Sequence, residues 1–588
     1  MRDASPPSAP SFSETTDSSC TSIIPLAHIS VKLVKAFVQP DGSHGNGAGV
    51  VLLPGVTHTE IEHGNSTSRA LGISNRRFPS NNDCQKIAKR VGLPETSFVL
   101  FPKENGWSSR ENRSILEERK DNVNIGNGSN EKADFHVKWY TPECEVDMCG
   151  HATIALAGYI YSIMKGRANT DTNANCDVGT RQQNRYFWRM QCKAGLLGIE
   201  VAKGSSKSID GIDHSNGNNA QNRESNQRNN HALDSLPRVV MEQAIPEFCG
   251  SIDFNEIAAS LSIQAEGDLA ITITDDNSEE NNTSKSENIE QVFPFPHCEV
   301  VSTGGRDLMI PVRSTVLNEM GILDNGRYNS GGDDNKRDQL CRSINVVSKR
   351  YDIVGYHLFE VDDNLFRSKH DSDSENEPPV EMKSSSQRDR NGGIIEGNDI
   401  DEDCPIHLNE LIRIFQIANE EGGSKVQSCL EAVGIKEDRW YGNEETMKSQ
   451  HDNIDKETRI PTVPSVRKSR TILVSGVRNF APSVGIPEEP ATGSANGALA
   501  CYLVKYFFLD ACCRSDSSNS NNLKHRDNGH SLDNPVCFRF CMEQGRAMGE
   551  PCLIDAEIEV VNGTIRKVKV GGLVNVTGET LDLDLTST

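Results

Sequence analysis

Two long apolar segments constrain most strongly what this chain can fold into. The first follows the turn Cys149-Gly150-His151-Ala152-Thr153 and runs to about residue 164, and the second follows Ala491-Thr492-Gly493-Ser494-Ala495 and runs to 508. Both are apolar on almost every side, which predicts two buried helices. The first turn of a helix carries unpaired N–H groups and the positive end of the helix dipole. If the two ends meet inside the protein, they form a cradle for a carboxylate or a phosphate.

Charge and composition exclude several classes of partner. The net charge is −23, and the acidic residues are scattered, so we expect neither nucleic acid nor an anionic membrane to bind. No stretch supplies the roughly 20 apolar residues of a spanning helix, and the N-terminus has no apolar signal core. We therefore expect a cytoplasmic protein. Its 17 cysteines form no Cys-x-x-Cys pair with metal spacing, which favours reduced thiols and predicts no structural metal.

Polar insertions interrupt a core of ordinary composition. Only 35% of the chain is hydrophobic, against about 45–50% in typical globular proteins. The shortfall is concentrated in six stretches rich in Asn, Ser, Asp, Gly and Lys, which we interpret as disordered insertions: about 204–233, 275–289, 324–341, 367–403, 442–458 and 514–534. Between them, β-strands accompany a buried helix twice over.

This repetition predicts an α+β fold in which strands wrap around a central buried helix, twice over. Residues 1–29 are expected to be a disordered N-terminus. The first repeat is expected over 30–203 and the second over 234–576.

Local patterns place the elements around the two helices. A helix is expected at 82–91, with Gly92 as its C-cap, and a hairpin at 185–201 that turns near Gly195. Strands are expected at 98–101, 134–140, 270–273, 351–361, 472–474, 536–542, 553–561 and 567–576.

The cradle offers anion donors, and several neighbouring side chains could move a proton. The backbone N–H groups of Gly150, His151, Gly493 and Ser494 are the natural donors, together with the Ser494 hydroxyl and the His151 imidazole. Acid/base candidates near the motifs are Glu95, Asp147, Cys149, His151, Glu488 and Glu489. By sequence alone Glu95 could equally be a surface carboxylate at the start of a strand.

Cys149 is a second kind of candidate, because a helix N-terminus lowers the pKa of a thiol. A racemase that works without a cofactor usually needs a thiol on each face of the substrate carbon. The second turn has Thr492 and Ser494 where the partner thiol would stand. Cys149 therefore lacks the partner thiol that such a racemase needs.

The ordered set of motifs resembles the phenazine-biosynthesis PhzF family, within the diaminopimelate-epimerase-like superfamily. The matching pieces are Gly45-Asn46, Leu93-Pro94-Glu95-Thr96-Ser97-Phe98, Tyr140-Thr141-Pro142, Cys149-Gly150-His151-Ala152-Thr153, Thr303-Gly304-Gly305, Phe480-Ala481-Pro482, Glu489-Pro490-Ala491-Thr492-Gly493-Ser494-Ala495, Gln544-Gly545 and Val570-Gly571-Gly572. They run from about 31 to 585 in family order. Each motif is weak alone, but the ordered set is specific.

The resemblance implies two pseudo-symmetric domains, each a strongly curved β-sheet or barrel wrapped around a central buried helix, with the last strand, at about 577–588, returning to the first domain. It implies a site in the cleft between these domains. It implies that Glu95 is the general acid/base, that Glu489 and His151 assist, and that a small carboxylate-bearing metabolite is the substrate. It further implies that Asn46, Gly150, His151, Gly493 and Ser494 bind that substrate. No cofactor is expected, and a homodimer is the expected assembly.

Two departures from the family pattern affect the choice of reaction. The usual Gly-Asn-Pro is Gly45-Asn46-Gly47 here, and Glu489 replaces the usual Asp. One extra methylene can move a carboxylate by about an ångström, enough to alter the rate or the substrate. Two alternatives to the isomerase therefore stay open: a two-thiol amino-acid racemase or epimerase, and a non-catalytic binding or regulatory protein on the same fold.

Overall fold

The computed structural model describes residues 28–53, 78–101, 133–168, 185–204, 236–271, 293–320, 334–366, 404–435, 467–509 and 535–584. The expected insertions at 275–289, 367–403, 442–458 and 514–534 lie outside these residues, as does nearly all of 204–233.

The described chain contains both strands and helices. The strands are β1 His28–Val38, β2 Asn46–Leu52, β3 Glu95–Leu100, β4 Phe135–Tyr140, β5 Glu145–Val146, β6 Arg185–Cys192, β7 Gly195–Lys203, β8 Pro237–Gln243, β9 Glu247–Ser251, β10 Glu299–Ser302, β11 Arg306–Arg313, β12 Gly355–Val361, β13 Ile406–His407, β14 Arg467–Ala481, β15 Ile486–Glu489, β16 Val536–Gln544, β17 Cys552–Val561 and β18 Thr564–Asp584. The helices are α2 Asn81–Val91, α4 Gly150–Ala168, α6 Phe254–Leu261, α7 Ala265–Asp268, α8 Ser314–Glu319, α9 Asp334–Tyr351, α10 Leu408–Glu420, α11 Lys425–Ala432 and α13 Gly493–Val504. Single turns of 3₁₀-helix cover Asp363–Phe366, Pro482–Val484 and Arg546–Met548, and a π-helical turn, Lys505–Leu509, continues α13.

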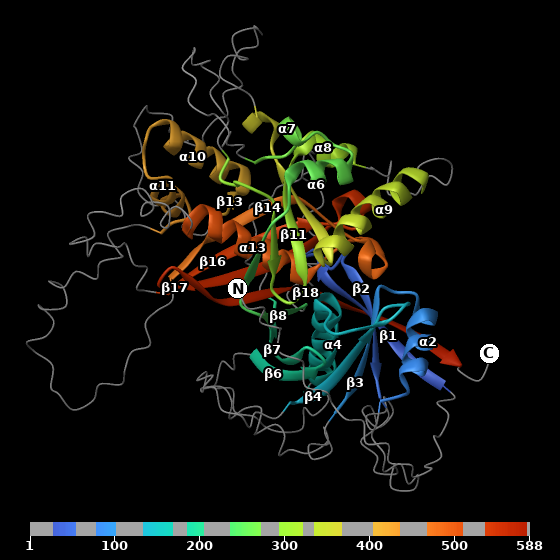
Figure 1. Ribbon diagram of the computed structural model, residues 1–588. Helices are drawn as coiled ribbons and strands as arrows, with labels where there is room; N and C mark the ends of the chain where they lie inside the picture. The colour runs from blue at the N-terminus through green and yellow to red at the C-terminus, as the bar shows by residue number, and fades with distance from the viewer. Residues whose placement is uncertain are drawn as a thin grey trace, which may run out of the picture.

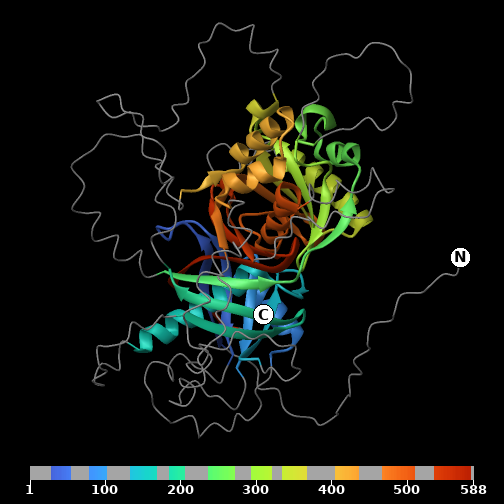
Figure 2. The ribbon, with the colours of Figure 1, turned by 90° about the vertical axis from the view of Figure 1, so that its left-hand side faces the viewer.

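The molecule has two parts, which lie one above the other in Figures 1 and 2. The lower part in Figure 1 contains β1–β4, β6, β7, α2 and α4, and the upper part contains α6–α11, α13 and the strands around them. Strand β18 runs between the parts and ends near the C-terminus in the lower one. Its first residues pair with β17 and its last residues with β1.

Helix α4 is buried on every side, as its sequence predicts. Residues 151–161 are all buried, and the helix packs against β1, β2, β3, β7, β8 and β18. Strand pairing connects these neighbours in the order β18, β1, β2, β3, β4, β6, β7, β8, and β8 pairs again with β18. An apolar helix at this place removes hydrocarbon from water around its whole circumference.

Helix α13 is buried to the same degree in the upper part. Every residue of α13 except Ser494 is buried, and the helix packs against β10, β11, β16, β17 and β18. The sheet on this side runs β18, β17, β16, β14, β12, β11, β10, β9. The structure is therefore a mixed, sheet-rich α+β fold in which β18 contacts both central helices.

Several expected boundaries are confirmed and others are wrong. Helix α2 ends at Gly92, which has the left-handed conformation (φ 67°) of a C-cap glycine. The expected insertion at 324–341 is wrong at its C-terminal end, because α9 begins at Asp334. The expected strand at 351–361 begins only at Gly355, since α9 continues to Tyr351, and β1 begins at His28, inside the expected disordered N-terminus.

Helices α10 and α11 were not expected at all. Both are amphipathic, with exposed polar faces and buried side chains such as Leu411, Phe415 and Leu430, and this helical periodicity in the sequence was the available signal. None of the helices in the described part of the chain is long and apolar enough to cross a membrane.

A single added methyl group tests how closely α4 packs on β18. A Cβ atom at Gly158 would lie 2.5 Å from Val574 Cγ1. Alanine is the better helix former, by about 1 kcal/mol, but overpacking costs about 1–3 kcal/mol. We expect Gly158→Ala to lower the free energy of unfolding, and Val574→Ala in the same chain to recover part of the loss. Urea unfolding of the two single variants and the double variant measures this coupling, and strictly additive effects would contradict the contact.

Candidate functional site

The N-terminal ends of the two buried helices meet. A Cβ atom placed on Gly150 would lie 3.4 Å from the Cα atom of Gly493 and 3.6 Å from the backbone nitrogen of Ser494. The positive ends of both helix dipoles are therefore brought to one place. A Cβ atom on Gly493 would in turn lie 3.7 Å from the Cα atom of Gly150, so the two helix ends are separated by little more than the space of one methyl group.

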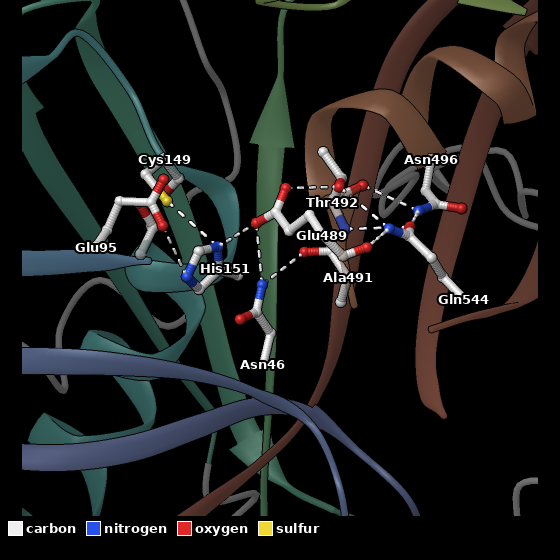
Figure 3. A network of polar contacts seen from close by, with 10 residues as sticks. Asn46, Glu95, Cys149, His151, Glu489, Ala491, Thr492, Asn496 and Gln544 are labelled. Atoms are coloured by element: carbon white, nitrogen blue, oxygen red, sulfur yellow. Dashed lines mark hydrogen bonds and ion pairs between the residues drawn. The ribbon is translucent and has the colours of Figure 1, made fainter. Parts of the chain in front are cut away.

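The His151 imidazole lies between two carboxylates from different parts of the chain (Figure 3). Its Nε2 atom is 3.1 Å from Glu95 Oε2, and its Nδ1 atom is 3.0 Å from Glu489 Oε1. Glu95 begins β3 and His151 lies in the first turn of α4, whereas Glu489 ends β15. All three side chains are buried, with no more than 6% of each residue exposed.

Glu489 is fixed by donors from both parts of the molecule. Asn46 Nδ2 donates to Glu489 Oε1 (3.0 Å) and to the Ala491 carbonyl (2.9 Å), and Thr492 Oγ1 donates to Glu489 Oε2 (2.7 Å). Asn46 lies at the start of β2, so this amide joins the lower part to the turn that opens α13. The carboxylate of Glu489 thus has a fixed orientation toward His151.

Gln544, to which the sequence assigned no role, holds the same turn. Its Nε2 donates to the Glu489 carbonyl (2.7 Å), while its Oε1 accepts from the Thr492 backbone N–H (3.1 Å) and from Asn496 Nδ2 (2.6 Å). The side chain is completely buried. The Gln544-Gly545 pair in the sequence was the available signal, but nothing in it indicated which residues the amide would contact.

The carbonyl groups at the start of α13 are held from another side. Gln243 Nε2 donates to the Gly493 carbonyl (3.0 Å). Thr303 Oγ1 lies within hydrogen-bonding distance of Gln243 Oε1 (2.9 Å) and of the Ser494 carbonyl (3.1 Å). The Thr303-Gly304-Gly305 motif therefore positions the helix end.

The buried setting raises the pKa of Glu95. Burial is the largest cause and the nearby Glu489 charge adds to it, while the His151 charge and a contact with Cys149 oppose it, and the resulting pKa is about 7. Glu95 Oε2 and His151 Nε2 are close but are not aligned for a hydrogen bond, since neither atom has a hydrogen-bond partner. Their attraction is therefore mainly electrostatic.

His151 is stabilised as an imidazolium. Burial lowers its pKa, but Cys149, Glu95 and the hydrogen bond to Glu489 raise it, and the net effect places the pKa well above its usual value. Both ring nitrogens can then donate, one toward each carboxylate.

The Cys149 thiol is not activated by its place at the helix N-terminus. Its Sγ atom lies 3.4 Å from His151 Nδ1 at the start of α4, but burial and the Glu95 charge raise the thiol pKa to about 11. The helix dipole does not outweigh desolvation here. The residue in the corresponding place of the second turn is Thr492, whose hydroxyl is bound to Glu489.

The structure brings together most of the candidates and separates two. Asn46, Glu95, Gly150, His151, Glu489 and Gly493 lie in one cluster with Ser494 at its edge, where this residue is half-buried. Asp147 instead pairs with Lys193, with 65% of its side chain exposed, and Glu488 pairs with Arg478. Glu95, Cys149 and His151 also each offer one metal-ligand atom, and these three atoms lie within 4.8 Å of one another.

A second layer of buried polar side chains lies on the inner face of the upper sheet. Strand pairing sets His357 beside Asn479 and Asn479 beside Glu489, while Asp307 faces Gly355 on the neighbouring pair. Asp307 Oδ2 has no hydrogen-bond partner, and burial with the Glu489 charge raises the pKa of Asp307 to about 7.

Comparison with known proteins gives a family for this arrangement. The sequence profile of the phenazine biosynthesis-like protein family matches residues 34–186 and 443–579. An uncharacterized isomerase of Clostridium acetobutylicum is 36% identical over 101 residues, which is 17% of this chain and 26% of the relative. A human phenazine biosynthesis-like domain-containing protein is 31% identical over 90 residues, 15% of this chain and 23% of the relative. The chain thus matches about a quarter of the length of these curated relatives.

Two solved structures also align with this chain. A PhzF-family phenazine biosynthesis protein of Bacillus anthracis aligns over 95% of this chain and 99% of its own, with 15% identity and a TM-score of 0.41. A hydroxyproline epimerase of Agrobacterium vitis aligns over 95% and 92%, with 8% identity and a TM-score of 0.34.

The Asp307 carboxyl makes stability depend on pH. Its folded-state pKa of about 7 lies above the ordinary value of 3.8, so the folded protein holds this proton more tightly than the unfolded chain does. The free energy of unfolding therefore falls as pH rises from about 4 through 7. Each pKa unit corresponds to about 1.4 kcal/mol. We expect Asp307→Asn to become progressively more stable than the wild type as pH rises over this window.

Urea unfolding at a series of pH values measures this difference. Asp352→Asn is the matched control, because 92% of that side chain is exposed and asparagine tolerates its left-handed backbone (φ 53°). Parallel curves for the wild type and Asp307→Asn would show that Asp307 is ionised in the folded protein.

Proposed function

Because residues 34–186 and 443–579 belong to the phenazine biosynthesis-like protein family, we propose that this protein is an isomerase that moves a proton between carbon atoms of a small carboxylate. Relatives named as isomerases support this class of reaction. Glu95 is the general acid/base of the proposed reaction, and no cofactor takes part. The observation that carries the proposal is the buried Glu95 carboxyl beside an imidazole that Glu489 holds in place.

Glu95 has the properties that proton transfer requires. A general acid/base works best when its pKa lies near the working pH, and burial raises the Glu95 pKa to about 7. In the first step Glu95 takes a proton from a substrate carbon, and the electron pair of that C–H bond moves into the adjacent unsaturated or carboxylate system. In the second step the same carboxyl returns the proton to a different carbon. The proton balance closes without an oxidant or a reductant.

The two helix ends supply the electrostatic part of catalysis. Negative charge builds up on the substrate when the proton leaves, and the backbone N–H groups at Gly150 and Gly493 lie at the positive ends of two helices. Ser494, half-buried at the edge of the cluster, adds a hydroxyl donor. We therefore assign Gly150, His151, Gly493 and Ser494 to substrate binding.

Glu489 and Asn46 act by positioning. Glu489 accepts from His151, Asn46 and Thr492, so the imidazole is held against Glu95. The longer side chain of glutamate, compared with aspartate, spans this distance. We infer that the choice of Glu489 shifts His151 and through it Glu95, and thereby contributes to the choice of substrate.

We propose that the two parts are pseudo-symmetric domains, each a curved sheet around its helix, and that the protein acts in the cytoplasm as a homodimer. Its partner is a small carboxylate-bearing metabolite and neither nucleic acid nor a membrane, as the net charge of −23 favours.

Replacing Glu95 with glutamine removes the acid/base and keeps the shape. We expect Glu95→Gln to lower turnover by about 10²–10⁴-fold, the usual contribution of a general acid/base, with ligand binding retained. Deuterium entry into carbon positions of a panel of small carboxylates in D₂O measures turnover, and calorimetry measures binding. Glu143→Gln, at an exposed carboxylate, is the control. An active Glu95→Gln variant would exclude Glu95 as the base.

Replacing Cys149 with serine separates this mechanism from a two-thiol racemase. The Glu95 mechanism predicts that Cys149→Ser lowers deuterium exchange by no more than about tenfold, less than the loss of a general acid/base. Complete loss of exchange in Cys149→Ser, with the fold intact by circular dichroism, would favour the thiol mechanism instead.

A further inference from the structure

We propose that Glu95, Cys149 and His151 also form a site for a thiophilic divalent cation, with Zn²⁺ as the best fit, and that the bound cation switches the site off. The binding part of this proposal rests on geometry alone. The inhibitory part rests on the proposed function, because it assumes that Glu95 carries the proton.

The three side chains have the identities and the spacing of zinc ligands. A carboxylate oxygen, a sulfur and a ring nitrogen lie within 4.8 Å of one another. Zinc binds these atom types at about 2.0–2.3 Å, so ligands around a tetrahedral ion lie about 3.3–3.8 Å apart. Glu95 Oε2 lies 3.1 Å from His151 Nε2, the nitrogen that would bind the ion, whereas Cys149 Sγ lies 3.4 Å from the other ring nitrogen, Nδ1. The sulfur must therefore move toward the Nε2 side of the ring to share an ion with Glu95 Oε2.

Two of the candidate ligand atoms have no hydrogen bond. Glu95 Oε2 and His151 Nε2 are both buried, and neither has a hydrogen-bond partner although they are 3.1 Å apart. A buried polar atom without a partner is unfavourable and is unusual in a folded protein. An ion bound by both atoms would satisfy both at once.

The surroundings of His151 are those of a metal-binding histidine. Such residues donate the second ring N–H to a carboxylate, which directs the other nitrogen at the metal. Here His151 Nδ1 lies 3.0 Å from Glu489 Oε1, and Glu489 is itself fixed by Asn46 and Thr492. The lower part of the molecule therefore supplies the three ligands, and the upper part supplies Glu489, the carboxylate that orients His151.

The sulfur ligand decides which ion fits. Thiolate and imidazole favour Zn²⁺, whereas Mg²⁺ and Ca²⁺ prefer sites made of oxygen atoms. On binding, the Cys149 S–H proton and the His151 Nε2–H proton leave to solvent, and their electron pairs are donated to the ion. No electron is transferred. With an oxygen of Glu95 bound to the ion, that carboxylate is no longer free to take a proton from a substrate carbon.

Cobalt(II) reports directly on the thiolate. Bound to a thiolate, Co²⁺ gives a sulfur-to-metal charge-transfer absorption, and it replaces Zn²⁺ in tetrahedral sites of this kind. Because the chain has 17 cysteines, the informative quantity is the difference between variants. We expect Cys149→Ser to bind one equivalent less Co²⁺ and to lose the corresponding absorption. Cys192→Ser, another buried thiol of the lower part, is the matched control and should titrate like the wild type.

The orienting carboxylate provides a second test. We expect Glu489→Gln to lower Zn²⁺ affinity by about 10–100-fold, the usual effect of removing such a partner. Competition with a chromophoric zinc chelator measures this affinity without any substrate. Wild-type Co²⁺ stoichiometry and absorption in Cys149→Ser would overturn the proposal, and so would unchanged zinc affinity in Glu489→Gln.

The experiments test the metal site and the proposed reaction independently. Inhibition of deuterium exchange by Zn²⁺, reversed by a chelator and not produced by Mg²⁺, is the expected consequence if both are correct. Absence of exchange with every carboxylate, together with a Cys149-dependent Co²⁺ signal, would leave the metal site standing and remove the isomerase. Exchange that Zn²⁺ does not inhibit, with no Cys149-dependent Co²⁺ signal, would leave the isomerase standing and remove the metal site.

Discussion

The rest of the site depends on one buried imidazole held between two carboxylates. His151 contacts Glu95 from its own part of the molecule and Glu489 from the other, at 3.1 and 3.0 Å. A lone charge in such a place would be strongly unfavourable, and a triad with one positive centre between two acidic groups reduces that penalty. The same contact orients the acid/base and joins the two parts of the molecule. Loss of the charge of either carboxylate would therefore destabilise the imidazolium.

The helices, the turns and the buried amides all support this contact. Helices α4 and α13 are buried around their whole circumference, so their N-terminal ends are fixed with respect to the strands that surround them. The two helix ends meet at Gly150 and Gly493. Asn46 and Gln544, both almost fully buried, then fix the turn that carries Glu489. Each of these contacts restricts the positions open to the residues it holds. Together they give the site the rigidity that proton transfer needs.

The sequence was informative where burial is complete and much less so where it is partial. An apolar surface on every side identified α4 and α13, and family motifs pointed to Glu95, His151 and Glu489 as candidates. Helices α10 and α11 were missed because their signal is a helical periodicity of apolar residues between polar segments, and no motif or run of apolar residues marks it. Nor could sequence show that Glu95 is buried or that desolvation outweighs the helix dipole at Cys149, since both depend on contacts between residues far apart in the chain. Asn46 and Glu489, for example, are 443 positions apart.

Measuring the charge state of His151 tests most directly whether an imidazolium lies between the two carboxylates. In protein labelled with ¹⁵N-histidine, nuclear magnetic resonance distinguishes a ring with two N–H groups from a neutral ring with one. The 15 histidines can be separated by comparison with a His151→Gln variant. We predict that the resonances lost in that variant belong to an imidazolium, protonated on both nitrogens, at about pH 7.5, above the ordinary histidine pKa. A neutral ring with a single N–H group at that pH would contradict the carboxylate–imidazolium–carboxylate contact on which the account is built.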